Sequence, residues 1–379
     1  MLKTASRSLL TLLFLLSLLT WFSLQVLVAW ELSIVTTQLG PILAVIALLA
    51  LVPLKPWALI KTPFTPPFRP GDVFFIALGV VAIATYLTPT IAAMIDHPGA
   101  VNVVKLFEPA ESKVDFTRYT FQAANKTTPL NLDFYPPAEN LKRLTQTAPW
   151  ILVIHGGGWI NGDSQQLPEL NWHLAKLGYG VISVDYRLSP GWIWPAPKDD
   201  VTNAIEFIRA HSAEWKIDPE RWAILGRSAG AQIAGVVAYS LHGDARPKGF
   251  VSFYGPSDLV FGYGVGQEND ILRSRTLLRG FLGGAPEDAK ALYESASEMN
   301  MVTKDACPTL LIHGERDILV WVKHSDRLLK TLQDNGIDSP FVRMRFGPHG
   351  FDFFFNGPEG QVATNAVETF LARVLPIAP

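Results

Sequence analysis

Residues 222–230 read WAILGRSAG, an apolar run that ends in a turn with a glycine on each side of a serine. Small residues in a helical pattern follow in AGAQIAGVVAYSL, residues 229–241. A strand, a tight turn and a helix in this order expose the Ser228 hydroxyl at the carboxyl end of the strand. Gly226 and Gly230 suit the turn because a Cβ at either position would collide with neighbouring backbone. The stretch therefore predicts a nucleophilic serine.

Other apolar runs of strand length also stop at turn residues, and helical patterns such as that of Val201, Ile205 and Ile208 lie between them. This alternation predicts an α/β fold with a mostly parallel sheet and helices on both faces. Functional residues of such sheets lie at the carboxyl ends of strands. The predicted strands are Trp150–Ile154, GVISVDYR (180–187), GFVSFYG (249–255), PTLLIHG (308–314) and FVRMRFG (341–347), after an opening hairpin of FTRYTFQ (116–122) and LNLDFYPP (130–137).

A serine hydroxyl needs a base to take its proton, and the chain order expected for this turn is Ser, Asp, His. Asp317 follows a predicted strand in LLIHGERDILV, and His349 follows the next strand in RFGPHGF. Both residues are thus expected on loops at strand ends, where they can converge with Ser228. Glu315 is an alternative acid.

The negative oxygen of a tetrahedral intermediate needs preset hydrogen-bond donors. The sequence HGGGW at 155–159 follows the first strong strand, where part of such an oxyanion hole belongs. We expect the donors to be the backbone N–H groups of Gly157, Gly158 and Ala229. His155 is expected to support this loop and not to act as the base.

These motifs, together with DYRLSP and FYGPSDL, resemble those of the hormone-sensitive-lipase-like and BD-FAE-type carboxylesterases of the α/β-hydrolase superfamily. The resemblance covers about residues 115–375. It implies a Ser228–Asp317–His349 triad, a small-molecule ester as substrate, and no metal or organic cofactor. Arg227 before the serine departs from the acidic residue of many such esterases and fits the BD-FAE type. The resemblance also implies that Tyr186, Arg187 and Asp200 support the fold.

Charged residues are distributed unevenly: residues 1–100 hold 8 of them and the other 279 residues hold 58. Three charge-free stretches of 23 residues, 8–30, 32–54 and 73–95, are long enough to cross a bilayer as helices. The middle stretch is the least apolar, so an interfacial or re-entrant helix is the alternative for it. The first stretch is too long for a cleaved signal peptide. The sequence therefore predicts a membrane segment at 1–100 and a hydrolase domain at 101–379.

Basic residues suggest how this segment is oriented. Lys3 and Arg7 precede the first stretch, and Lys55, Lys61 and Arg69 lie between the second and third. Because short loops rich in Lys and Arg stay in the cytoplasm, three crossings would place the hydrolase domain outside it. Two crossings would place that domain inside. The prediction is a multi-pass membrane protein with an extracytoplasmic hydrolase.

The net charge and the single cysteine narrow the range of possible functions. A net charge of −2 gives no basic excess for nucleic acid. The single cysteine, Cys307, is expected to be a buried residue.

An insertion at about 257–306 is expected to form a lid or acyl pocket, in which Trp159, Trp192 and Trp194 are either lining or core residues. An amidase, formamidase or peptidase, an acyltransferase acting on envelope lipid or polymer, and a binding module are the alternative functions.

Overall fold

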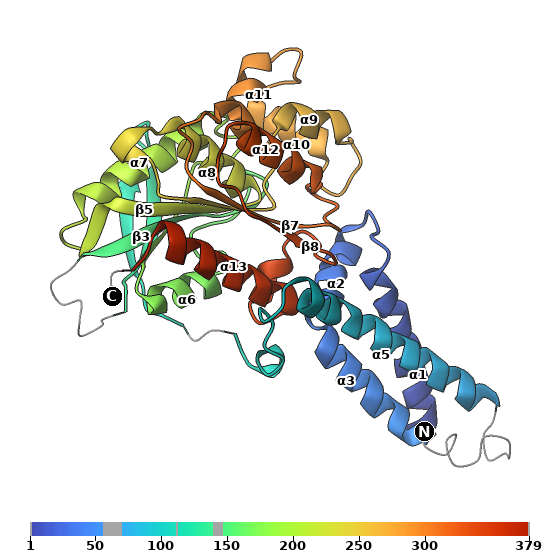
Figure 1. Ribbon diagram of the computed structural model, residues 1–379. Helices are drawn as coiled ribbons and strands as arrows, with labels where there is room; N and C mark the ends of the chain where they lie inside the picture. Colours follow the sequence, from blue (N-terminus) through green and yellow to red (C-terminus); the bar gives the residue numbers. More distant parts are fainter. Residues whose placement is uncertain (1, 56–69, 111–112, 139–146, 378–379) are drawn as a thin grey trace. The chain divides into compact units, whose positions relative to one another are not determined.

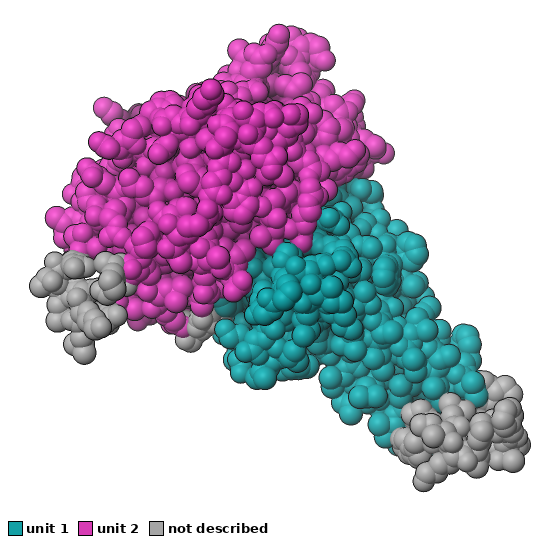
Figure 2. All heavy atoms as spheres, in the orientation of Figure 1, with its two compact units in different colours: residues 1–110, 314–318, 344–363 teal, residues 111–313, 319–343, 364–379 magenta. Residues whose placement is uncertain are grey.

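The computed structural model describes residues 2–55, 70–110, 113–138 and 147–377. These residues form two compact units, coloured separately in Figure 2. Unit 1 comprises residues 1–110, 314–318 and 344–363, and unit 2 comprises residues 111–313, 319–343 and 364–379. The basic residues Lys61 and Arg69 lie outside the described residues.

The described residues form one sheet of eight strands in the order β1-β2-β4-β3-β5-β6-β7-β8. β2 pairs antiparallel with β1 and β4, whereas the neighbouring strands from β4 through β3, β5 and β6 to β7 pair in parallel. The predicted, mostly parallel α/β sheet is therefore confirmed. Its strands are β1 (Thr117–Gln122), β2 (Pro129–Tyr135), β3 (Ala148–Ile154), β4 (Gly180–Val184), β5 (Ile217–Arg227), β6 (Phe250–Phe253), β7 (Thr309–Gly314) and β8 (Phe341–Met344).

Helices cover both faces of the sheet in unit 2 (Figure 1). α7 (Ala196–Ala210) and α8 (Ala229–Ser240) lie on one face, and α6 (Glu169–Leu177) lies on the other. All residues of β3, β4, β6 and β7 are buried, which explains why their sequences are continuous apolar runs. The insertion before β7 holds α9 (Leu259–Val265), α10 (Ser274–Leu282) and α11 (Lys290–Ala296), while α12 (Lys323–Asp334) and α13 (Pro358–Val374) follow later in the chain.

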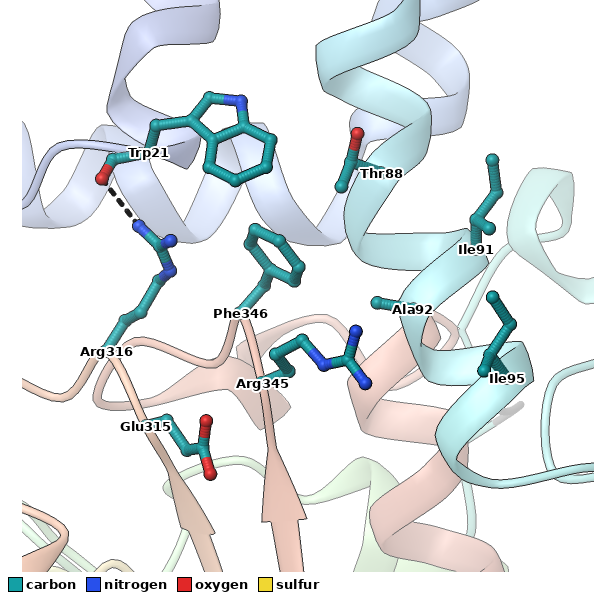
Figure 3. Close-up of a pocket in the computed structure, with 9 residues that line it drawn as sticks. All are labelled: Trp21, Thr88, Ile91, Ala92, Ile95, Glu315, Arg316, Arg345 and Phe346. Carbon is teal, nitrogen blue, oxygen red and sulfur yellow. Dashed lines mark hydrogen bonds between the residues drawn. The ribbon is translucent and has the colours of Figure 1, made fainter.

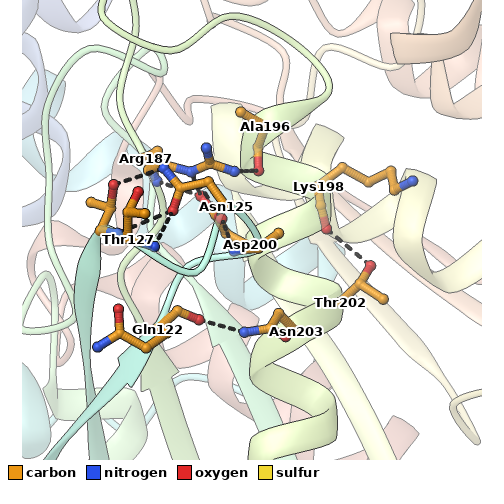
Figure 4. A network of polar contacts seen from close by, with 11 residues as sticks. Gln122, Asn125, Thr127, Arg187, Ala196, Lys198, Asp200, Thr202 and Asn203 are labelled. Carbon is orange, nitrogen blue, oxygen red and sulfur yellow. Dashed lines mark hydrogen bonds and ion pairs between the residues drawn. The ribbon is translucent and has the colours of Figure 1, made fainter.

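A buried ion pair fixes the loop that follows β4 (Figure 4). Arg187 Nε lies 2.7 Å from Asp200 Oδ2, and the Arg187 backbone N–H donates to the same oxygen. Asp200 Oδ1 also accepts the backbone N–H of Ala124 in the turn between β1 and β2. One carboxylate in α7 thus joins two loops, as expected for a residue that supports the fold. Removing either partner would leave a buried charge unpaired, which costs about 3–5 kcal/mol.

Among the described residues of its first hundred, unit 1 contains four α-helices: α1 (Leu2–Ser17), α2 (Leu27–Gln38), α3 (Gly40–Leu51) and α5 (Pro70–Asp96). The apolar stretch 73–95 lies within α5. The stretch 8–30 is divided: helix ends at Thr20 and resumes at Leu27. The break is stabilised by Arg316, whose side chain donates to the Trp21 carbonyl, an oxygen without an intrahelical partner.

The stretch 32–54 is also divided, because α2 and the helical segment Gly40–Leu54 meet at an angle of 82°. Pro41 lies in the first turn of α3, where its missing N–H costs nothing. A Cβ at Gly40 would lie 2.2 Å from the Tyr86 carbonyl oxygen, so only glycine permits this close contact with α5. Within the part of the chain that the structure describes, two helices, Leu2–Thr20 and Gly71–Asp96, are thus long and apolar enough to cross a membrane, and a third span exists if the bent pair counts as one.

α1 and α5 run parallel. Near their first turns, Lys3 and Arg7 form ion pairs with Asp72 at 3.2 and 2.6 Å. Further along both helices, the Tyr86 hydroxyl donates to the Leu13 carbonyl at 2.7 Å. Residues later in α1 therefore contact residues later in α5. The two helices run in the same direction and finish at the same end of the bundle.

α3 runs in the opposite direction to α5. Its first residue, Gly40, contacts Tyr86, whereas its last residue, Leu51, packs against Gly79, about two turns earlier in α5. The chain therefore returns through α3 to the end of the bundle where α1 and α5 begin.

Gln38, the last residue of α2, contacts the first turn of α13. Its side-chain oxygen accepts the backbone N–H of Glu359 at 3.3 Å, and its amide donates to the Glu359 carboxylate. Burial raises the pKa of this carboxyl group from 4.5 to about 7. Between pH 4.5 and about 7 the folded protein therefore keeps a proton on Glu359 that the unfolded chain has already released.

We expect the melting temperature of the full-length protein to fall between pH 4.5 and about 7, because the stabilising proton on Glu359 is lost across that interval. Glu359→Gln should remove this contribution. Scanning fluorimetry in detergent, from pH 4 to 8, measures the effect. An unchanged pH slope in the variant would contradict it.

Candidate active site

Ser228 lies at the turn between β5 and α8 with φ of 52° and ψ of −122°. This conformation is rare for a residue with a side chain and costs about 1–3 kcal/mol. The Ser228 N–H donates to the Phe253 carbonyl in β6 at 2.9 Å, and its own carbonyl accepts the N–H of Ala231 at 2.9 Å. The serine is therefore held in a strained turn at the carboxyl end of a central strand.

The glycines around Ser228 permit two close backbone contacts. A Cβ at Gly226 would lie 2.4 Å from the Gly230 carbonyl oxygen, and a Cβ at Gly230 would lie 2.2 Å from the carbonyl oxygen of His155. The turn after β5 and the end of β3 thus touch through their backbones. A Cβ at Gly156 would lie 3.4 Å from Ser228 Cβ, so the glycine loop after β3 is adjacent to the serine.

The glycine loop adopts backbone angles that favour glycine. Gly157 and Gly158 have φ of 111° and 60°, and a Cβ at Gly157 would lie 1.9 Å from the Asn161 carbonyl oxygen. Gln166 stabilises the loop because its Oε1 accepts the Gly156 N–H at 2.8 Å. No sequence motif had singled out Gln166. Ala229 is the first residue of α8, where a backbone N–H has no intrahelical acceptor.

His155 is a structural residue of this loop. Its ring stacks on Tyr186 with centroids 4.3 Å apart, and Nδ1 lies 2.7 Å from the Gly156 carbonyl oxygen. Burial lowers the pKa of His155, because the protonated ring would be desolvated. The ring is therefore neutral near pH 7.

Asp317 and His349 are in direct contact. His349 Nδ1 lies 2.6 Å from Asp317 Oδ2, and both side chains are buried. Because an ionised carboxylate only accepts hydrogen bonds, this contact assigns a proton to Nδ1 and leaves Nε2 as the basic nitrogen. The two residues lie on the loops that follow β7 and β8, as the sequence analysis expected.

Glu315, the alternative acid, lines a pocket instead (Figure 3). The pocket has a volume of about 620 Å³ and lies within unit 1. One wall is formed by the last two turns of α5, and the other residues come from the helix break and from the loops after β7 and β8. Its lining residues are Trp21, Thr88, Ile91, Ala92, Ile95, Glu315, Arg316, Arg345 and Phe346.

The six predicted site residues thus fall into two groups. Ser228, Ala229, Gly157 and Gly158 are brought together in unit 2, and Asp317 and His349 are brought together in unit 1. Among the described residues, no group of three or more His, Cys, Asp or Glu side chains could hold a metal ion. Cys307 is buried, and burial raises its pKa to about 12, so it stays a thiol.

Helix α10 of the insertion covers the glycine loop. Trp159 stacks on Phe281 with centroids 4.4 Å apart, and a Cβ at Gly158 would lie 3.4 Å from Leu277. Trp159 and Trp194 are buried core residues, whereas Trp192 is partly exposed and lies over the Arg187 guanidinium. The insertion therefore supplies apolar side chains directly beside the candidate oxyanion donors.

Comparisons with known proteins bear on the family and the fold of this chain. The family model described as BD-FAE matches residues 132–332. LipM of Mycobacterium tuberculosis, a probable carboxylic ester hydrolase, is 31% identical over 246 residues, which cover 61% of this chain and 56% of that protein. LipQ, an esterase of the same organism, is 30% identical and covers 60% and 56%. The chain thus matches little more than half the length of these curated relatives.

Among solved structures, the chain is similar to EstE1, a thermostable carboxylesterase cloned from a metagenomic library. The TM-score is 0.59 at 22% identity, over 76% of this chain and 96% of that one. This likeness establishes the shared fold.

We expect Gly230→Ala to slow the reaction of Ser228 with a fluorophosphonate probe by about 100-fold, because the new methyl group would push the His155 carbonyl and the serine turn apart. Labelling kinetics of the full-length protein measure this. Gly264→Ala is the matched control, since a Cβ there would meet no atom within 4 Å. Equal labelling rates for both variants would contradict the predicted role of the close contact.

Proposed function

Because this chain belongs to the BD-FAE family of α/β-hydrolases, we propose that it is a serine ester hydrolase that forms an acyl-enzyme on Ser228. The observation that carries the proposal is the strained conformation of Ser228 at the β5–α8 turn. Backbone strain concentrates at functional sites, where the surrounding structure compensates for it. The hydrogen bond from Ser228 N–H to Phe253 and the close glycine contacts supply that compensation.

In the proposed acylation step, Ser228 Oγ attacks the carbonyl carbon of the ester and His349 Nε2 takes the hydroxyl proton. The Asp317 carboxylate stabilises the imidazolium that forms. When the intermediate collapses, the C–O bond of the ester breaks and the alcohol leaves with the proton from His349. Water then attacks the acyl-enzyme and gives one proton to His349. When this second intermediate collapses, the bond between the acyl carbon and Ser228 Oγ breaks, Oγ takes that proton back from His349, and the carboxylic acid leaves.

The oxyanion of each tetrahedral intermediate would be bound by the backbone N–H groups of Gly157, Gly158 and Ala229. Two features support this role: the N-terminal position of Ala229 in α8, and the contact between the glycine loop and Ser228. Removal of one such donor typically lowers turnover 10²–10³-fold. Leu277 and Phe281 of α10 would form an apolar wall for the acyl chain, because they contact Gly158 and Trp159 of the same loop.

We expect Ser228→Ala to lower kcat for p-nitrophenyl acetate by about 10³-fold or more, because catalytic triads act as a unit. Asp317→Asn should lower kcat similarly, because a neutral amide does not hold His349 in the tautomer with a proton on Nδ1 and does not stabilise the imidazolium. Kinetics on the full-length protein, with p-nitroanilides beside the esters, test both the residues and the ester preference.

Glu315→Gln is the matched control, two residues before Asp317 and on the same loop. It should keep most of the activity, because Glu315 lines the pocket. A severe effect of Glu315→Gln with a mild one of Asp317→Asn would reverse the choice of acid. Normal turnover by Ser228→Ala would refute the mechanism.

We also propose that α1, the bent pair of α2 with α3, and α5 cross the membrane and that the hydrolase lies outside the cytoplasm. The parallel arrangement of α1 and α5 supports this, because two parallel spans require the chain to cross back between them. α3 runs in the required direction. The basic residues Lys3, Arg7 and Lys55 all lie at the end of the bundle where α1 begins, as expected for the cytoplasmic side.

We expect alkaline phosphatase fused after residue 379 to be active in a bacterial host, and green fluorescent protein fused there to be dark. Fusions after Lys55 should give the reverse pattern, because α3 returns to the cytoplasmic side. A fluorescent C-terminal fusion would contradict the three-span arrangement. Phosphatase activity after Lys55 would contradict the return through α3.

A further inference from the structure

Residues 21–38, which follow the first apolar helix and include α2, contact the loop that carries His349. The indole N–H of Trp30 in α2 donates to the His349 backbone carbonyl at 3.0 Å. One helical turn later, Ile34 packs against Gly350, where a Cβ would lie 3.7 Å from Ile34 Cδ1. Residues four apart share one face of a helix. That face of α2 therefore holds the backbone of His349 and of the residue after it.

The same segment contacts the loop that carries Asp317 (Figure 3). Arg316, the residue before Asp317, donates to the Trp21 carbonyl at 2.6 Å. Its guanidinium lies 5.6 Å from the Trp21 ring and 4.8 Å from the Phe346 ring, and the two rings pack edge to face. The acid loop and the start of the base loop are thus joined through Trp21.

A third contact fixes the far end of the base loop. Gln38, at the end of α2, accepts the Glu359 N–H and donates to its carboxylate, and a Cβ at Gly357 would lie 2.6 Å from Gln38 Oε1. Residues 21–38 therefore contact the polypeptide before Asp317, at His349, and beyond His349. All of these contacts lie within unit 1.

Such contacts matter because the acid and the base come from different loops. A 1 Å displacement of a reacting group can lower a rate about 100-fold. The Asp317–His349 hydrogen bond of 2.6 Å requires both loops to hold their positions. Each loop is bound by the same short segment, which fixes one loop with respect to the other.

Resting on the proposed hydrolase function, we propose that residues 21–38 are a positioning segment for the Asp317–His349 pair, with Trp30 as the positioning residue of His349. The N-terminal region is then part of the catalytic apparatus as well as a membrane anchor. Activity depends on α2 even though no residue of α2 contacts the reacting atoms in the mechanism above.

Trp30→Phe in the full-length protein tests this, because Phe keeps the aromatic ring and removes the N–H donor. Loss of one hydrogen bond should lower kcat for p-nitrophenyl acetate about 3–10-fold, with KM nearly unchanged. The acid limb of the kcat/KM profile should move to lower pH, because a loosened Asp317 contact stabilises the imidazolium less. Trp30→His, which retains a ring N–H, should recover part of the activity.

Two controls separate positioning from general destabilisation. Val28→Ala changes a residue of the same helix that is 60% exposed, and should leave the kinetics unchanged. Trp150→Phe removes a hydrogen bond of the same kind in unit 2, in which the Trp150 indole N–H donates to the Asp218 carbonyl at 2.9 Å. It should lower the melting temperature and leave the acid limb in place.

The outcomes distinguish this inference from the function on which it rests. An inactive Ser228→Ala beside a Trp30→Phe with normal kcat and an unmoved acid limb would overturn the positioning role alone. Trp30→Phe could instead lower kcat, leave the acid limb in place and reduce the fraction of protein labelled by the fluorophosphonate. That result would also overturn the positioning role, because only folding would then be affected. An active Ser228→Ala would overturn both proposals.

Discussion

Where β3 and β5 end side by side, their backbones approach to a distance that only glycine permits. A methyl group at Gly230 would lie 2.2 Å from the His155 carbonyl oxygen. This contact places the serine turn against the glycine loop, and it depends on the parallel pairing of β3 with β5 in a sheet buried on both faces. The proposed nucleophile and oxyanion donors therefore take their geometry from main-chain packing. Side chains such as Gln166 and Tyr186 then hold the loop in place.

The proposed acid and base depend on a different set of contacts. Asp317 and His349 lie in the unit that also contains the N-terminal helices. The Trp21 carbonyl, the Trp30 indole and the Gln38 amide contact these loops at Arg316, His349 and Glu359. The hydrogen bonds that hold the proposed acid–base pair thus lie within unit 1.

Much of the fold could be predicted from sequence, because buried parallel strands leave continuous apolar runs that end at glycine. The order Ser228, Asp317, His349 also followed from strand ends, and the 2.6 Å contact favours Asp317 over Glu315. The breaks at Trp21 and Leu39 could not be predicted from apolar composition, since side chains that face lipid and those that face protein are alike in hydropathy. The contact between Trp30 and His349 joins residues 319 positions apart and leaves no local pattern.

The discontinuity of unit 1 has a consequence for biosynthesis. Its helices belong to the first 110 residues, but the loops they bind come from residues 314–318 and 344–363. At 5–20 residues per second, the ribosome needs about 10–40 s to make the intervening chain. During that time Trp21, Trp30 and Gln38 have no loops to bind. The proposed acid–base pair can therefore assemble only after the greater part of the chain has been made, long after the helices that hold its loops.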